Sequence, residues 1–256
     1  MDLGIKGRKA IVCASSRGLG RGCAEALAEA GVDIVINGLD ETRLKQTAKE
    51  ISDKWSVSVT PVAADLANPE GQAALLSACP NPDILINNNG GPPKKDFREL
   101  DRAAMLEGVT MNMITPIELI QAVINGMTER GFGRIVNITS ISVKMPLTGL
   151  DLSSGARAGL TAFLAGICRP VADKNVTINN ILPGVFNTDR IRNVFDTSGG
   201  KTMEELVAER AAGIPAKRLG DPAEFGKLCA FLSSEHAGYI TGQNFLIDGG
   251  LFNGAF

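Results

Sequence analysis

Short apolar runs alternate with longer amphipathic segments along most of this 256-residue chain. The run at 10–12 is typical of a buried strand, and small and apolar groups follow on one face of a helix. Residues 41–55 carry Leu44, Ile51 and Trp55 at helical spacing, with charged residues between them. These two patterns predict a β-strand, an α-helix, a second strand at 33–37 and a second helix in succession.

The same alternation continues to the end of the chain. It predicts further strands at 57–63, 83–87, 133–139, 176–182 and 243–248, and further helices at 68–78, 101–130, 150–173, around 203–212, and after a cap at Asp221 and Pro222. Pro116 predicts a kink or a break in the long helix. Regular alternation of this kind indicates one α/β domain over 1–256, a doubly wound parallel seven-stranded sheet with helices on both faces.

Polar and glycine-rich residues follow the predicted strands. They lie at 15–20, 37–38, 65, 87–91, 139–142 and 183–184. In a doubly wound sheet, ligands bind beyond the carboxyl ends of the strands. One edge of the sheet is therefore expected to carry the chemistry.

The first of these segments reads Ser15, Ser16, Arg17, Gly18, Leu19 and Gly20. Glycines let the backbone approach a ligand, and the first amides of a helix lack partners within it, so a pyrophosphate fits such a turn. A turn of this kind also serves tight packing alone, so the motif by itself leaves both interpretations open.

Composition narrows the class of partner. The net charge is −2, the pI is near 5.6, and no basic stripe is present, which argues against nucleic acid or an anionic membrane surface. No apolar run has the length of a signal peptide core or of a membrane span, so the cytoplasm is the expected location. The five cysteines are scattered among apolar residues, which predicts buried thiols, with neither a disulfide framework nor a metal site.

Taken together, these segments resemble the short-chain dehydrogenase/reductase family over essentially the whole chain. Its Thr-Gly-x-x-x-Gly-x-Gly motif matches 13–20 with the first Thr and Gly replaced, its Asn-Asn-Ala-Gly element matches 87–90, and its closing Ile-Thr-Gly-Gln and Asp-Gly-Gly match 240–243 and 248–250. The resemblance implies a Rossmann-type fold, a nicotinamide cofactor and a small-molecule substrate. It also implies a homotetramer built with the last helix and strand, with a homodimer as the alternative.

Further site residues are carried over from the family. The resemblance places Asp65 with Leu66 at the adenine, Asn88 and Gly90 along the dinucleotide, and Pro183, Gly184 and Thr188 on the nicotinamide side. It also assigns Ser140 as the catalytic serine and Asn112 as the residue that helps to hold a proton-relay water.

The family's Tyr-x-x-x-Lys pair is replaced in this register by Ser153 and Arg157. A serine is a far weaker acid than a tyrosine, and an arginine stays charged and cannot relay a proton, although it can hold a ribose or a carboxylate. The single tyrosine, Tyr239, and the single histidine, His236, lie in the closing segment, where a structural role is expected.

One substitute proton donor is Lys144, four residues after Ser140. A lysine drawn into a cleft beside Arg157 would have its pKa lowered toward neutrality. Our hypothesis is that Lys144 donates the proton while Ser140 and Ser153 bind the substrate oxygen. A solvated loop lysine is the alternative interpretation.

The sequence gives only weak signs of whether the cofactor carries a 2′-phosphate. After the second strand stand Gly38 and Leu39, where NAD-preferring members have an acidic residue and NADP-preferring members often have an arginine. Without that acid, and with Arg17 in the turn, the sequence favours NADP, with NAD as the alternative. Segment 188–214 is expected to cover the substrate, and its Arg190 and Arg192 either receive an anionic substrate or lie solvated.

The sequence therefore predicts an oxidoreductase that transfers a hydride between NADPH and a small carbonyl or alcohol with a non-standard proton donor. Two other classes stay open: a lyase or isomerase on the same fold, and a non-catalytic dinucleotide-binding protein.

Overall fold

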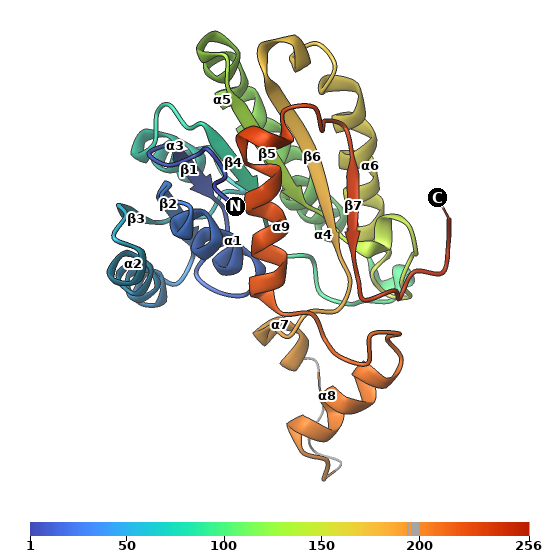
Figure 1. Ribbon diagram of the computed structural model, residues 1–256. Helices are drawn as coiled ribbons and strands as arrows, with labels where there is room; N and C mark the ends of the chain where they lie inside the picture. Colours follow the sequence, from blue (N-terminus) through green and yellow to red (C-terminus); the bar gives the residue numbers. More distant parts are fainter. Residues whose placement is uncertain (194, 196–199, 256) are drawn as a thin grey trace.

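A seven-stranded parallel sheet forms the centre of the molecule in the computed structural model, which describes all residues except 194, 196–199 and 256 (Figure 1). The strands are β1 (Lys9–Val12), β2 (Asp33–Gly38), β3 (Val59–Ala63), β4 (Ile84–Asn87), β5 (Gly133–Ile138), β6 (Val176–Pro183) and β7 (Asn244–Ile247), in the order β3-β2-β1-β4-β5-β6-β7. The order reverses between β1 and β4, which is where doubly wound sheets bind ligands.

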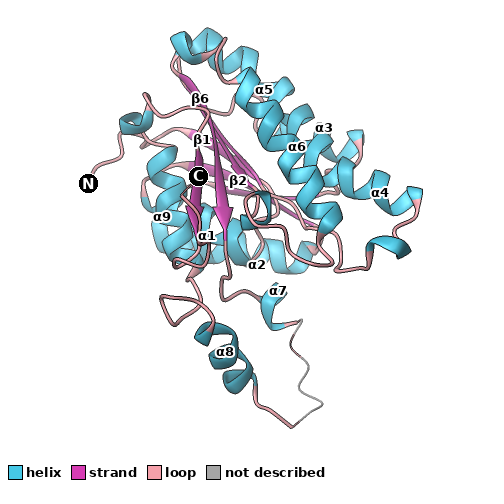
Figure 2. Ribbon diagram, turned by 90° about the vertical axis from the view of Figure 1, so that its right-hand side faces the viewer, coloured by secondary structure: helices cyan, strands magenta, loops and turns pink. Residues whose placement is uncertain are grey.

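Helices cover both faces of the sheet (Figure 2). They are α1 (Gly18–Glu29), α2 (Glu41–Trp55), α3 (Pro69–Ala78), α4 (Arg102–Val109), α5 (Thr115–Arg130), α6 (Asp151–Ile167), α7 (Asp189–Arg192), α8 (Met203–Ala212) and α9 (Pro222–Leu232). Alternate side chains of β1 and of the residue after it divide the core between the faces: Ala10 and Val12 pack with α1, α2 and α9, whereas Ile11 and Cys13 pack with α3, α5 and α6. The predicted α/β fold with its parallel sheet is confirmed.

Two helices differ from the expected bounds. The helix expected to reach residue 173 ends at Ile167, because Pro170 follows closely and has no N–H for a helical bond. The long helix is broken as expected, by one π-helical turn at Thr110–Ile114, and Pro116 lies in the first turn of α5. A proline is tolerated there because its missing N–H needs no partner in the first turn.

The segment after β6 lies beyond the carboxyl ends of the strands, where Figure 1 shows α7 and α8 below the arrowhead of β7. Helix α8 has the predicted bounds, and a capping box between Thr202 and Glu205 explains its start. This segment has a small apolar cluster separate from the main core, in which Ile214 and Leu219 pack with Val185. Within the predicted 188–214 segment, positions 194 and 196–199 lie outside the described residues.

All five cysteines are free and buried, as their apolar neighbourhoods predict. Burial raises the pKa of the Cys13 thiol to about 12. In the described part of the chain, no helix is both long and apolar enough to cross a membrane.

Candidate active site

The glycine-marked turn after β1 opens α1 at the point where the strand order reverses. Helix α1 has no side-chain cap, so its first amides stay available to a phosphate. Gly18 has a φ of +58°, and Ala14, which stands where the family motif has glycine, has a φ of +45°. A Cβ at Gly20 would clash with the backbone carbonyl oxygen of Ala14 and would lie 2.8 Å from Nδ2 of Asn88, so only glycine fits there.

Ser15 of the turn and Asn37 of β2 face inward and shape the turn. The hydroxyl of Ser15 donates to the Val12 carbonyl at 2.6 Å and accepts from the Asn37 amide at 3.1 Å, and Ser15 is fully buried. The Asn37 carboxamide accepts from Ala14 at 3.3 Å. Ser15 therefore holds the turn in shape, while Ser16, Gly18 and Leu19 keep partial exposure.

Asparagines tie the ends of neighbouring strands together. Asn87 donates to Oδ1 of Asn137 at 2.9 Å, and Asn137 donates to the Asn179 carbonyl at 3.2 Å, so the bonds cross from β4 to β5 and β6. Asn88 donates to the Ala14 carbonyl at 3.1 Å and joins the loop after β4 to the turn after β1. These bonds fix the two loops that border the cleft between β1 and β4.

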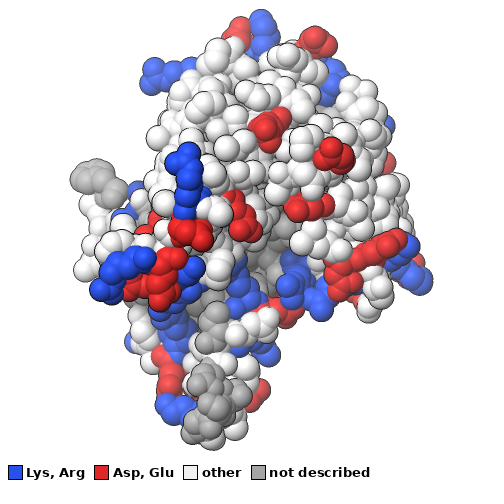
Figure 3. Space-filling view, turned by 180° about the vertical axis from the view of Figure 1, so that it is seen from behind, with Lys and Arg blue, Asp and Glu red and all other residues white. Residues whose placement is uncertain are grey.

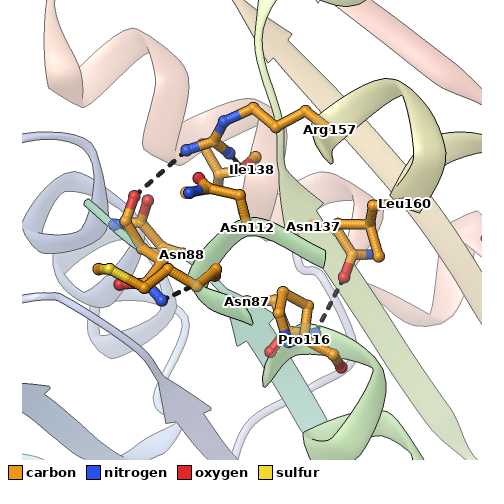
Figure 4. Close-up of a pocket in the computed structure, with 10 residues that line it drawn as sticks. Asn87, Asn88, Asn112, Pro116, Asn137, Ile138, Arg157 and Leu160 are labelled. Atoms are coloured by element: carbon orange, nitrogen blue, oxygen red, sulfur yellow. Dashed lines mark hydrogen bonds between the residues drawn. The ribbon is translucent and has the colours of Figure 1, made fainter. Parts of the chain in front are cut away.

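Asn112 lies in the π-helical turn and is 1% exposed. Its Nδ2 donates to the Gly108 carbonyl at 3.1 Å, whereas its buried Oδ1 has no partner among the described residues. Figure 4 shows the side chains of Asn112 and Arg157 turned into the same small pocket, which Asn88 and Ile138 also line. An unpartnered buried acceptor in such a pocket is the feature expected where a water or ligand binds.

Arg157 lies on α6 with its guanidinium inside this pocket (Figure 4). Its nitrogens donate to the Ile138 carbonyl at 2.7 Å, the Asn89 carbonyl at 3.3 Å and the Ser153 hydroxyl at 3.3 Å. Among the described residues, no carboxylate lies within ion-pair distance of it. Burial, together with the nearby Arg190 charge, lowers the pKa of Arg157 to about 10, so it remains a cation near neutral pH.

Ser140 and Lys144 flank the one-turn helix at Ile141–Val143. The Ser140 hydroxyl accepts from the Ser142 amide at 3.1 Å and stays half-buried. Nζ of Lys144 lies 5.6 Å from the ring centre of Phe252. Among the described residues, the Lys144 side chain makes no hydrogen bond to Ser140, Ser153 or Arg157, and Lys144 is not among the residues that line the pocket of Asn112 and Arg157.

The remaining predicted residues lie around the same edge. Asp65 is exposed and accepts from the Ala67 amide at 3.0 Å, and Leu66 is buried beneath it. The Gly184 amide donates to the Ile247 carbonyl at 2.9 Å, directly after Pro183. Thr188 lies over the turn after β1, with its methyl 3.5 Å from the position of a Cβ on Gly18. Gly90 has open space around it.

Sequence reasoning missed a charged cluster beside the turn. Asp189 lies 3.3 Å from Arg17 and 3.5 Å from Arg43, measured from one carboxylate oxygen to the guanidinium nitrogens. Arg43 sits in the first turn of α2, whose N-cap residue Asp40 also lies 3.8 Å from it. The helical position of Arg43, soon after the second strand, was the signal in the sequence that could have found it.

Tyr239 and His236 lie away from these residues. Tyr239 is fully exposed in the closing segment, and His236 contacts the Asp2 carbonyl at 2.8 Å. Neither reaches the pocket of Asn112 and Arg157. In the described part of the chain, no group of three or more His, Cys, Asp or Glu residues is arranged to hold a metal ion.

A nicotinamide dinucleotide fits these features. The uncapped amides of α1 suit a pyrophosphate, Arg17 and Arg43 suit a further phosphate, and the unpartnered Asn112 oxygen lies deeper in the cleft. The residues thus provide anion binding at one end and buried polar groups at the other, which is the division that a dinucleotide requires.

Known proteins match the chain over nearly its whole length. Residues 13–252 match the family model described as enoyl-(acyl carrier protein) reductase. The 3-oxoacyl-(acyl-carrier-protein) reductase FabG of Vibrio cholerae serotype O1 is 32% identical over 254 residues, covering 98% of this chain and 99% of that protein. The acetoacetyl-CoA reductase of Cupriavidus necator is 32% identical over 259 residues, with 96% and 99% covered.

A solved structure extends the match to three dimensions. The L-sorbose reductase from Gluconobacter frateurii, complexed with NADPH and L-sorbose, superposes with a TM-score of 0.94 at 29% identity, covering 100% of both chains. With the parallel sheet, the glycine turn and the family model in agreement, the chain belongs to the short-chain dehydrogenase/reductase family.

Proposed function

We propose that the protein is an NADPH-dependent reductase that transfers a hydride to the carbonyl carbon of a small molecule and works without the family's Tyr-x-x-x-Lys pair. The observation that carries this proposal is the position of Arg157, held by the Ile138 and Asn89 carbonyls in the pocket of Asn112. The related proteins are named as reductases, and the L-sorbose reductase was solved with NADPH.

A bound nicotinamide would supply the hydride, and the residues of this chain would bind the cofactor, orient the substrate and protonate its oxygen. The amides at Gly18, Leu19 and Gly20 would hold the pyrophosphate, and Arg17 and Arg43 would hold the 2′-phosphate. Asp65, Leu66, Asn88, Gly90, Pro183, Gly184 and Thr188 complete the proposed cofactor site. Orientation of the hydride donor beside the acceptor can contribute more to the rate than general acid catalysis does.

The proton follows a different route from that of the family. Ser140 and Ser153 bind the substrate oxygen, Arg157 orients Ser153, and Asn112 holds a water in the pocket. The ammonium of Lys144 donates a proton to the forming alkoxide, and the resulting amine recovers its proton from solvent. General acid catalysis of this kind typically contributes about 10² to 10⁴ in rate.

The quaternary structure belongs to the same proposal. Met105, Leu106, Ile114 and Phe163 are exposed apolar residues on α4, the π-helical turn and α6. Figure 3 shows that the broad face on that side of the molecule is mostly uncharged, with scattered acidic side chains. We propose that a second copy of the chain covers this face, forming a homodimer or, with α9 and β7, a homotetramer.

Five free thiols suit the reducing conditions of the cytoplasm, which is the proposed location.

Separate titrations with NADPH and NADH, followed by absorbance at the nicotinamide band across a panel of ketones, test the reductase proposal. The double variant Ser153→Tyr with Arg157→Lys is assayed in parallel. Activity of the native protein supports the proposal, and activity that appears only in the double variant supports a non-catalytic binder. Turnover of a substrate without any change in nicotinamide absorbance supports a lyase or isomerase.

The role of Lys144 is tested by Lys144→Met, with the exposed Lys227→Met on α9 as the matched control. We expect turnover of a ketone substrate to fall by about 10² in the first variant and to stay within about twofold in the second. The NADPH dissociation constant should be the same in both. Unchanged turnover in Lys144→Met would remove the lysine from the mechanism.

A further inference from the structure

Asp189 is the first residue of α7, yet its carboxylate bridges two arginines from elsewhere in the chain. One oxygen lies 3.3 Å from Arg17 in the glycine turn and 3.5 Å from Arg43 in α2. The side chains of Asp189 and Arg17 are 55% and 56% exposed. Ion pairs this exposed are weak and screened by salt, so the carboxylate can be displaced.

The residues on either side of Asp189 attach the same segment to both borders of the cleft. Thr188 lies over Gly18 in the turn after β1. Arg190 donates to the Gly91 and Pro92 carbonyls, each at 3.4 Å, in the loop after β4. The start of α7 therefore spans the space between the two loops that the dinucleotide would occupy under the proposed function.

We propose that Asp189 is a specificity-determining residue that competes with the 2′-phosphate of NADP for Arg17 and Arg43. The proposal rests on the proposed nucleotide site. A phosphate carries more charge than a carboxylate and forms forked hydrogen bonds with guanidinium groups, so NADPH can displace Asp189. NADH has no such phosphate and leaves the ion pairs intact.

Two consequences follow from this competition. Binding of the phosphorylated cofactor releases α7 from the glycine turn, whereas binding of the unphosphorylated cofactor does not. The affinity for NADPH is also lower than the two arginines alone would give, because part of the interaction energy goes into breaking the existing pairs. Asp189 therefore lowers the ratio of NADPH affinity to NADH affinity.

Equilibrium binding tests this inference without any turnover. Dissociation constants for NADPH and NADH are measured by fluorescence titration on the full chain and on Asp189→Asn, which keeps the size of the side chain and removes its charge. Asp53→Asn, which breaks an exposed pair with Lys49 on α2, is the matched control. We expect Asp189→Asn to bind NADPH about three- to tenfold more tightly, in line with the loss of a weak competing pair, with NADH unchanged.

The outcomes separate this inference from the proposed function. Equal NADPH affinity in the native chain and Asp189→Asn would overturn the competition while leaving the nucleotide site standing. Equal tightening for NADPH and NADH would also overturn it, because the 2′-phosphate would then play no part. If the native chain binds neither cofactor at millimolar concentration, the proposed function itself fails.

A second measurement on the native chain does not depend on any variant. Adenosine 2′,5′-bisphosphate carries the 2′-phosphate without a nicotinamide, and adenosine 5′-monophosphate is its control. Hydrogen exchange in a peptide spanning 186–193 should become several-fold faster with the bisphosphate only, because α7 loses its attachment to Arg17 and Arg43. Slower or unchanged exchange with the bisphosphate would overturn the release of α7.

Discussion

Two buried arginines, Arg134 and Arg157, lie at opposite edges of the same sheet and differ in what surrounds them. Arg134, at the amino end of β5, is 1% exposed and bonds to the carbonyls of Ser234, Gly133 and Asn175 and to Oδ1 of Asn175. Arg157, at the carboxyl edge, bonds to two carbonyls and to one hydroxyl. Burial lowers the pKa of each to about 10.

The two guanidinium groups differ in their neighbours. The ring of Phe132 lies under the guanidinium of Arg134 at 4.3 Å and under that of Arg8 at 3.7 Å, and Arg8 pairs with Asp83 and Glu235. At the other edge, Arg157 adjoins a pocket with the unpartnered oxygen of Asn112. A buried arginine surrounded by acceptors stabilises the fold, whereas one beside an open pocket has donors left for a ligand.

The largest expected effect is at the amino edge. Arg134→Met should lower the free energy of unfolding by about 3 kcal/mol, because it leaves several buried carbonyls without a donor. Denaturant titration measures this loss, and NADPH affinity of the folded protein should stay within about twofold. A marked loss of NADPH affinity at unchanged stability would reverse the contrast between the two arginines.

Arg157→Met should affect function more than stability. At neutral pH we expect a loss of about 1 to 2 kcal/mol in unfolding free energy, because removing an unpaired buried charge offsets part of the lost hydrogen bonding. Turnover should fall about tenfold to a hundredfold, since Ser153 loses its partner. A stability loss equal to that of Arg134→Met, with turnover unchanged, would make Arg157 another structural arginine.

Alkaline pH sharpens the same comparison. The pKa of Arg157 is lowered to about 10 in the folded chain, so the folded state releases a proton above that pH while the unfolded state keeps it until about 12.5. Below pH 10 the folded state therefore bears the whole free-energy cost of burying the charged guanidinium, and this cost decreases as the pH rises. By about pH 11 the native chain should gain stability on the order of 1 kcal/mol relative to Arg157→Met, and a constant difference in denaturant titrations would contradict the lowered pKa.

The smallest expected effect lies in the glycine turn at the carboxyl edge. Ala14 has a φ of +45°, a left-handed conformation that costs a residue with a Cβ more than it costs glycine. Ala14→Gly should therefore change the unfolding free energy by no more than about 1 kcal/mol and in the stabilising direction, although glycine adds freedom to the unfolded chain. Thermal unfolding measures it, and clear destabilisation would show that the turn is unstrained with alanine.

The sequence by itself determined the fold and the edge of the sheet at which the candidate site lies. Alternating apolar and amphipathic segments required a parallel sheet, and the turns at Gly18 and Gly90 marked the carboxyl ends of β1 and β4. Local patterns also gave the bounds of α2 and α8, because spacing and caps act within a few residues. Where a later proline stopped α6, the periodic pattern alone ran too far.

Only the tertiary structure decided which side chains meet. Asp189 follows Arg17 by 172 positions, and no local pattern links them, so their contact depends on the packing of α7 over the glycine turn. The surroundings of Arg134 and Arg157 could not be predicted from the sequence either, because the residues that bury them and accept their hydrogen bonds come from segments distant in sequence. The sequence gives the type and charge of each residue. The local dielectric constant around a side chain, and its hydrogen-bond and ion-pair partners, exist only after folding.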